Sequence, residues 1–178
     1  MSNIKIHYKD PLGYYSLSSF LKNELTDNTI IICIGTDKCI GDCLGPIIGS
    51  ILKEKFFPLP VYGTIENPIH ALNLDDKLSY IKSKHPNAKV LGIDACLGPP
   101  SKIGEIQLRD YPINPGKGVG KSLSPVGDIS IIGIVDSSEV DEPFSSRSIR
   151  LNFILEISKV ITNGLIHGYY LSNLNKSN

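Results

Sequence analysis

Two aspartates in glycine-flanked turns are the residues of this chain best suited to acid–base chemistry. Asp42 lies in IGTDKCIGDCLGP (34–46), which follows an apolar segment, and Asp94 lies at the end of a second apolar segment, KVLGIDA (89–95). Two carboxyl groups held close together do not both ionise easily, so one can serve as general base and the other as general acid on a water molecule. Asp is also common as a helix N-cap, so a structural role for either residue stays open.

The elements that must position these aspartates are buried strands. Three apolar segments show no alternation, as expected of strands covered on both faces: 29–35, 89–95 and 128–135. Helical patterns occupy 14–25, 42–56 and 145–167. Because strands and helices alternate, we expect an α/β fold, a three-layer αβα sandwich with a mostly parallel sheet. In such a fold the active site lies at the carboxyl ends of the strands.

Two further segments give more specific predictions. Pro68 is well placed for a first helical turn, and the apolar spacing predicts a helix from there to about Lys84, with a break near Asn73. Residues 103–113 alternate between apolar and polar, which indicates a half-exposed or edge strand.

Composition indicates an ordinary globular protein with no strongly charged partner. The 178 residues are most simply one domain, 1–178, with a core of about 14–167 and a frayed polar tail at 171–178. The 18 basic and 18 acidic residues give zero net charge, which argues against nucleic acid or a membrane as a main partner. The N-terminus lacks a signal-peptide pattern and the cysteines lack a disulfide spacing, so we expect a cytoplasmic protein.

Further candidate contacts for a substrate surround the aspartates. Glu66, Asn67 and His70 follow a short apolar segment, at the same expected edge of the sheet. Gly41 and Gly98 flank the two aspartate turns and would leave space for a substrate chain. A lone histidine near a helix start is, however, more often a hydrogen-bonded packing residue than a functional group.

Three cysteines could crowd near the aspartates, but their spacing does not indicate a metal site. Cys39 and Cys43 are four residues apart and Cys96 stands alone, so no second cysteine pair completes a structural zinc site. A small buried apolar role is expected for each of the three.

The segment PGKGVGKS (115–122) nearly matches a phosphate-binding loop, with Pro115 in place of the first glycine. Its context does not fit, because the preceding segment alternates and the following SLSPVG cannot form a helix. A loop that covers a site fits better, with Lys117 and Lys121 as contacts to substrate carboxylate or carbonyl groups. A nucleotide-dependent enzyme remains a third, weaker hypothesis.

Three motifs together resemble a known family: IGTDKCIGDCLGPIIG, GTIENPIHALN and GIDACLG, in this order. They resemble the YyaC-type spore proteases of spore-forming bacteria, which are similar to the germination protease and more distantly to hydrogenase maturation endopeptidases. The resemblance covers about residues 14–167. It implies a phosphorylase/hydrolase-like fold, a peptidase ancestry and a location in the forespore or spore. It also implies that Asp42 and Asp94 are the catalytic pair.

The resemblance does not extend to a complete metal site. Hydrogenase maturation endopeptidases bind a metal through an acidic residue, an aspartate and a later histidine, and the first two correspond to Asp42 and Asp94. No histidine lies between residues 86 and 166. We therefore expect no metal and no other cofactor, unless His70 substitutes from another strand.

Two functions follow as hypotheses. The first is a metal-independent peptidase, linked to sporulation or germination, that hydrolyses a protein or peptide substrate through Asp42 and Asp94. The second is a catalytically silent relative that binds a partner or regulates sporulation through the ancestral cleft.

Overall fold

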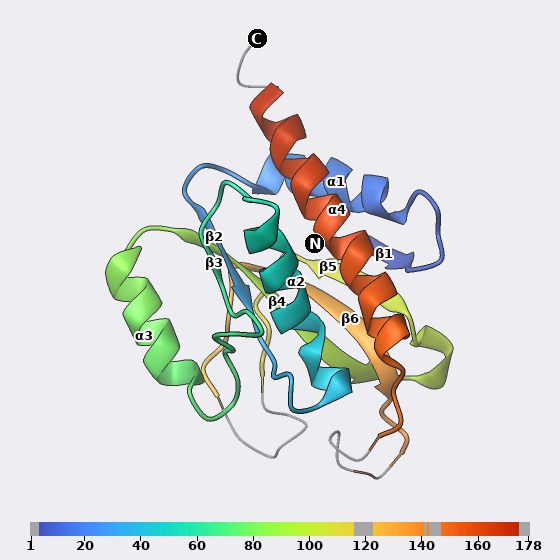
Figure 1. Ribbon diagram of the computed structural model, residues 1–178. Helices are drawn as coiled ribbons and strands as arrows, with labels where there is room; N and C mark the ends of the chain where they lie inside the picture. The colour runs from blue at the N-terminus through green and yellow to red at the C-terminus, as the bar shows by residue number, and fades with distance from the viewer. Residues whose placement is uncertain (1–3, 116–122, 141, 143–146, 175–178) are drawn as a thin grey trace.

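The computed structural model describes residues 4–115, 123–140, 142 and 147–174, which are built around one six-stranded sheet (Figure 1). The elements are β1 (Ile4–His7), α1 (Gly13–Glu24), β2 (Thr29–Cys33), η1 (Ile40–Cys43), α2 (Leu44–Glu54), β3 (Val61–Tyr62), α3 (Leu74–Lys84), β4 (Lys89–Gly98), η2 (Pro100–Lys102), β5 (Glu105–Arg109), β6 (Ile129–Ser137) and α4 (Leu151–Leu174). The strand order is β1-β5-β6-β4-β2-β3. Strands β3, β2, β4 and β6 are parallel, whereas β5 is antiparallel to both of its neighbours. The predicted α/β fold with a mostly parallel sheet is confirmed.

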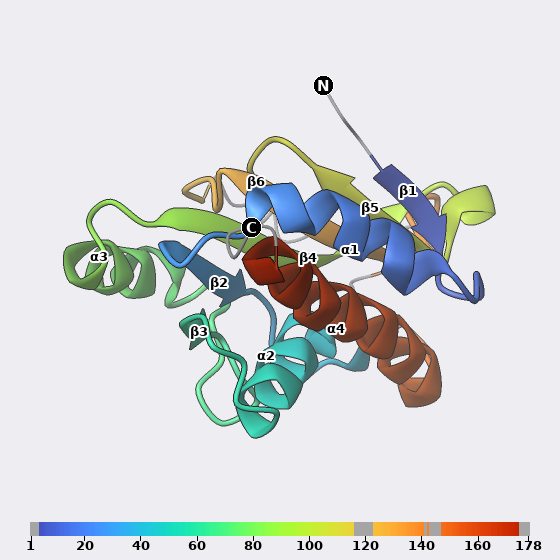
Figure 2. The same cartoon turned by 90° about the horizontal axis from the view of Figure 1, so that it is seen from above.

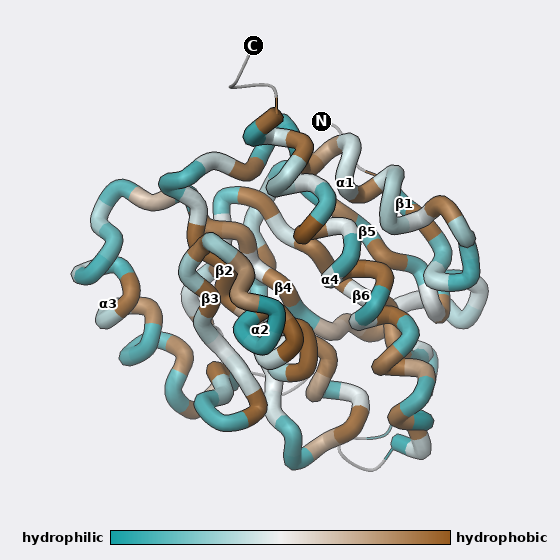
Figure 3. Tube along the Cα trace, turned by 45° about the horizontal axis from the view of Figure 1, so that its top comes forward, coloured by the Kyte–Doolittle hydropathy of each residue, from teal (hydrophilic) through white to brown (hydrophobic). Residues whose placement is uncertain are grey.

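In the described part of the chain, α1, α2 and α4 pack on one face of the sheet and α3 packs on the other. Figure 2 shows α1, α2 and α4 together against one side, with α3 apart from them. Successive side chains of β2 point to opposite faces of the sheet, because side chains alternate along a strand. Ile31 belongs to the apolar cluster of α1, α2 and α4, whereas Ile30 and Ile32 belong to that of α3. Both faces of the central strands are therefore hydrophobic, as their unalternating sequence predicts. Figure 3 shows the hydrophobic residues that follow one another along these strands.

Helix α2 lies unusually close to the end of β2 because glycines line its inner side. A Cβ on Gly45 would lie 2.1 Å from the backbone oxygen of Ile34. One turn later, a Cβ on Gly49 would lie 2.0 Å from the backbone oxygen of Gly63. Any side chain at these two positions would push the helix away from the sheet. The helix that follows the aspartate turn is therefore positioned by direct backbone contact.

Strand β5 is an interior strand, so the predicted edge position of residues 103–113 is wrong. It lies between β6 and β1, and β1 is the edge strand. Ile106 and Leu108 are buried on one face, and Gln107 between them is also buried. The side chain of Gln107 forms hydrogen bonds with the side chains of Glu105 and Arg109. These polar contacts on one face explain the alternation that suggested exposure.

Helix α3 begins at Leu74, later than the predicted start at Pro68. The side chain of Asn73 holds the preceding segment in a turn, because it accepts the His70 N–H at 2.9 Å and donates to the Pro68 oxygen at 3.1 Å. Ile69 forms an isolated parallel bridge with Ile34, which is incompatible with a helix there. The expected break near Asn73 is therefore the true helix start.

Helix α4 is displaced towards the C-terminus relative to its predicted range of 145–167. It begins at Leu151 and ends at Leu174, so residues 171–174 are helical and the predicted fraying of the tail is wrong for them. Gly164 and Gly168 pack directly on α1, which keeps the helix regular beyond its apolar stretch. No helix in the described part of the chain is both long and apolar enough to cross a membrane.

The close contact of α2 with β2 predicts an unusual sign for one substitution. Gly→Ala within a helix normally stabilises by about 1 kcal/mol. Gly45→Ala should instead lower the free energy of unfolding by about 2 kcal/mol or more, because the new methyl group overlaps the Ile34 oxygen. Urea unfolding measures the difference. Lys53→Ala, on the exposed side of α2, is the control and should change stability by less than about 0.5 kcal/mol. If Gly45→Ala stabilised the protein, the close contact of Gly45 with the Ile34 oxygen would be contradicted.

Candidate active site

Asp42 is held against the end of β2 by a close backbone contact. The chain leaves β2 at Cys33 and returns through η1, which contains Asp42 and leads directly into α2. Gly35 has a φ of 134°, and a Cβ there would lie 1.9 Å from the backbone oxygen of Asp42. That oxygen accepts a hydrogen bond from the Thr36 N–H at 3.0 Å. Because only glycine permits this approach, Gly35 determines where Asp42 lies.

Asp94 lies within β4, at the point where the neighbouring strand β2 has ended. β2 pairs with β4 only as far as Cys33 opposite Ile93, whereas β4 continues beside β6 to Gly98. The predicted strand of 89–95 is therefore too short at its end, because pairing with β6 carries β4 to Gly98. Asp94 is nevertheless the first residue of β4 past the end of β2, where the loop that carries Asp42 leaves the sheet.

The two carboxyl groups are electrostatically coupled. Burial raises the pKa of Asp42 from 3.8 to about 6, against the opposing effect of the Thr36 N–H. Burial also raises the pKa of Asp94 well above its ordinary value, and the negative charge of Asp42 raises it further, while the Ala95 N–H opposes both. That N–H donates to Asp94 Oδ1 at 2.8 Å. Asp94 therefore keeps its proton after Asp42 has lost its own.

A pair in these two states can do acid and base chemistry at the same time. Above the pKa of Asp42, which is about 6, its carboxylate can accept a proton from water. The neighbouring Asp94 still carries a proton that it can donate. Asp42 and Asp94 are both half-buried residues. The sequence predicted this pairing, and the effect of the Asp42 charge on Asp94 supports it.

His70 lies at the same edge of the sheet, next to the loop of Asp42. The oxygen of the preceding residue, Ile69, accepts a hydrogen bond from the Gly35 N–H at 2.7 Å. The Nδ1 atom of His70 accepts the Leu72 N–H at 3.3 Å. His70 is thus part of an ordered turn before α3 and not of the helix itself. His70 is half-buried. Its Nε2 atom takes no part in the hydrogen bond with the Leu72 N–H.

The remaining predicted contacts are spread around this edge. Gly41 is buried in η1, immediately before Asp42. Glu66 and Asn67 are exposed in the turn after β3, which is separated from β4 by β2. Gly98 is buried at the end of β4, where a Cβ would lie 3.0 Å from the Ile134 side chain, so packing alone accounts for this glycine.

The loop that contains Lys117 and Lys121 lies outside the described residues. Their predicted contacts to a substrate therefore stay predictions.

The cysteines near the site differ in their surroundings. Cys43 is buried and its Sγ donates to the Ile40 oxygen at 3.0 Å. Burial first, and then the nearby negative charges, raise the pKa of its thiol to about 11, so it is a poor nucleophile. Cys39 and Cys96 are only half-buried, although Cys96 packs against the apolar cluster on the α3 face, as an apolar role predicts. Within the described ranges, no three His, Cys, Asp or Glu side chains gather to hold a metal ion.

Two polar residues at this edge were not predicted. Asp136 lies near the carboxyl end of β6, opposite Leu97 of β4. Its Oδ2 pairs with Arg147 at 3.1 Å, and the Arg147 side chain is only 3% exposed. The guanidinium also donates to the Ser137 oxygen at 2.7 Å and so secures the chain after β6. An aspartate after an apolar strand was the signal that identified Asp94, and the same signal could have identified Asp136.

Fold and site together place this chain in the class of α/β proteins whose polar residues gather at the carboxyl ends of a mostly parallel sheet. Within that class it belongs to the family described as "Protein of unknown function (DUF1256)", which matches residues 5–164. It is also similar to a protein of Bacillus subtilis (strain 168) described as "Uncharacterized protein YyaC". The two are 41% identical over 150 residues, which cover 84% of this chain and 73% of that protein. Membership of the YyaC-type family is thereby confirmed, while the protease activity stays a prediction.

The coupling of the two carboxyl groups can be measured directly. Asp42→Asn removes the charge that raises the pKa of Asp94, so the Asp94 pKa should fall while staying above its ordinary value, because burial remains. The carboxyl carbon shift of Asp94, followed by NMR during a pH titration, reports this change. Asp37→Asn, on the exposed part of the same loop, should leave the titration of Asp94 unchanged. An unchanged Asp94 titration in Asp42→Asn would show that the two groups do not interact.

Proposed function

We propose that this protein is a peptidase that hydrolyses a protein or peptide substrate through Asp42 and Asp94. The observation that carries the proposal is the coupled pair, in which Asp94 keeps its proton beside the more readily ionised Asp42. Like charges held close together force such a division, and it supplies a base and an acid at one position. The two residues come from different segments, the loop after β2 and the middle of β4.

In the proposed reaction both groups act on one water molecule. The Asp42 carboxylate takes a proton from the water, and the oxygen of that water forms a bond to the carbonyl carbon of the peptide. Asp94 gives its proton to the carbonyl oxygen, which becomes the hydroxyl of a tetrahedral intermediate. When the C–N bond breaks, the leaving nitrogen receives the proton held by Asp42, and the hydroxyl proton returns to Asp94. The products are a carboxylic acid and an amine, and both aspartates return to their starting states.

The surroundings of the pair suggest how a substrate would be held. Gly41 leaves backbone beside Asp42 free of a side chain, and we propose that it borders the scissile bond. His70, Glu66 and Asn67 would contact the substrate on the β3 side of the edge. Substrate contacts by Gly98 and Lys117 stay predictions from the sequence. These roles rest on position in the fold and on the resemblance to the spore proteases.

The family relationship supports a further part of the proposal. The resemblance to YyaC-type and germination proteases suggests a three-layer, phosphorylase/hydrolase-like sandwich and a substrate met during sporulation or germination, in the forespore or spore. The mixed sheet with helices against both faces is compatible with that fold. The second candidate, a silent binding or regulatory protein, is motivated by the sequence, where no histidine between residues 86 and 166 matches the metal-binding histidine of the more distant endopeptidases.

Substitution of either aspartate should abolish cleavage. Asp42→Asn removes the base and Asp94→Asn removes a transferable proton, so each should lower the rate at least about a hundredfold. The measurement is the appearance of new N-termini, by mass spectrometry, after incubation with soluble protein from sporulating cells. Asp37→Asn is the matched control and should cleave like the original protein. Cleavage that survives in both Asn variants would contradict the paired mechanism, and a partner bound without cleavage would favour the binding protein.

The pH dependence of cleavage should differ from that of an ordinary exposed aspartate. Activity requires ionised Asp42, so the rate should rise with pH and reach half its maximum near the raised pKa of about 6, instead of near 3.8. At higher pH the rate should fall as Asp94 loses its proton. The initial rate on one identified cleavage site, measured across this range, tests both limbs. A half-maximal rate near 3.8 would remove Asp42 from the role of base.

A further inference from the structure

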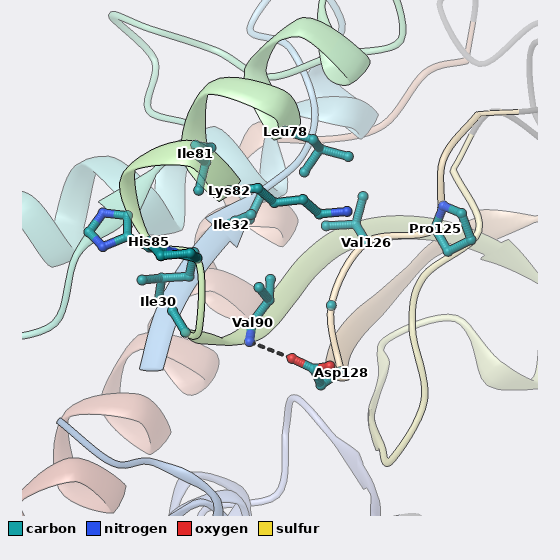
Figure 4. Close-up of a pocket in the computed structure, with 13 residues that line it drawn as sticks. Ile30, Ile32, Leu78, Ile81, Lys82, His85, Val90, Pro125, Val126 and Asp128 are labelled. Atoms are coloured by element: carbon teal, nitrogen blue, oxygen red, sulfur yellow. Dashed lines mark hydrogen bonds between the residues drawn. The ribbon is translucent and has the colours of Figure 1, made fainter. Parts of the chain in front are cut away.

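A cavity of about 220 Å³ lies on the α3 face of the sheet, between α3 and residues 125–128 (Figure 4). Its walls are mainly aliphatic and include Ile30, Ile32, Leu78, Ile81, Val90 and Val126. This volume would hold about seven waters at ~30 Å³ each, so it suits a small organic ligand and not a folded segment.

The cavity is separate from the candidate active site, although both lie along β4. Val90 lines the cavity at the start of the strand, and Asp94 is four residues later, roughly 13 Å away along it. Between them a two-stranded bridge covers Gly92, where a Cβ would lie 3.0 Å from the backbone oxygen of Val126. Ile113 and Val126 form this bridge through two hydrogen bonds of 2.9 Å. A ligand in the cavity would therefore not touch the acid pair.

Opposite charges border the cavity from its two walls. Lys82 reaches over it from α3, and in the described part of the chain its ammonium group has no ion-pair partner. Asp128 lies on the facing segment, where its Oδ2 accepts the Val90 N–H at 2.7 Å, as Figure 4 shows. This bond leaves Oδ1 available. His85 also lines the cavity, but its Nε2 is within 2.7 Å of the Tyr62 hydroxyl and is already hydrogen-bonded.

We propose that this cavity binds a free α-amino acid with a branched apolar side chain, such as leucine. The aliphatic walls would enclose the side chain, since burial of apolar surface is the main source of affinity available here. The ligand carboxylate would pair with Lys82 and its ammonium group with Asp128. A simple fatty acid satisfies only Lys82 and places a negative charge near Asp128, and a simple amine does the reverse. The zwitterion matches both charges, and the site does not depend on Asp42 and Asp94 being catalytic.

Amide NMR spectra of the full chain, titrated with leucine, test the proposal. A ligand of this size is expected to bind in the millimolar range, which NMR detects well. Leucine should shift the amide signals of Ile81, Val90 and Val126 in a saturable way. Isocaproate lacks the amine and isoamylamine lacks the carboxylate, so each should bind about tenfold more weakly. Serine, with the same two charges and no apolar side chain, should produce no saturable shift.

A pair of variants on α3 separates a specific site from a general charge effect. Lys82→Gln should weaken leucine binding about tenfold. Lys84→Gln, also exposed on the same helix but outside the cavity, should leave it unchanged. The proposal is overturned if leucine at tens of millimolar causes no saturable shift at the cavity residues. It is also overturned if isocaproate binds as tightly as leucine, or if the two lysine variants behave alike.

Discussion

The contact on which the candidate site depends is the direct approach of backbone to backbone at the end of β2. Gly35 and Gly45 let the aspartate turn and the start of α2 lie against the strand at distances that a methyl group would exclude. Side chains can adjust by changing rotamer, but two peptide groups in contact cannot. The position of the turn is therefore fixed by contact between backbone groups and not by side-chain packing. A catalytic group needs this kind of support, because small displacements cost a large part of the rate.

The acid pair is held at a cost to stability. Asp42 has a pKa of about 6 in the folded chain and 3.8 ordinarily, so the folded state binds more protons between these values. The free energy of unfolding therefore decreases as pH rises through this window, by on the order of 3 kcal/mol. A residue that served only as a helix cap would not require this arrangement. Groups that destabilise a fold at its working pH are characteristic of functional positions.

The sequence predicted the parts of this structure that local chemistry determines. Unalternating apolar segments identified the central strands, and the glycine-flanked aspartates after them identified Asp42 and Asp94. Features that depend on distant partners were missed. The interior position of β5 depends on β1, a strand of only four residues that the sequence analysis did not predict. The ion pair of Asp136 with Arg147 joins residues that are eleven positions apart in the sequence. Hydrophobic periodicity does not reveal a pair of this kind.

Asp94 belongs to a strand that is hydrogen-bonded on both sides, while the turn with Glu66 and Asn67 lies on the exposed surface. The proposed catalytic pair and the proposed substrate-recognition surface are thus carried by different kinds of structure. Exposed turns tolerate insertion and substitution far better than central strands. Members of the family could therefore diverge in what they recognise by altering this turn, without altering the geometry of the two carboxyl groups. Sequence variation is therefore expected in the turn that borders the site and not in the strand that carries Asp94.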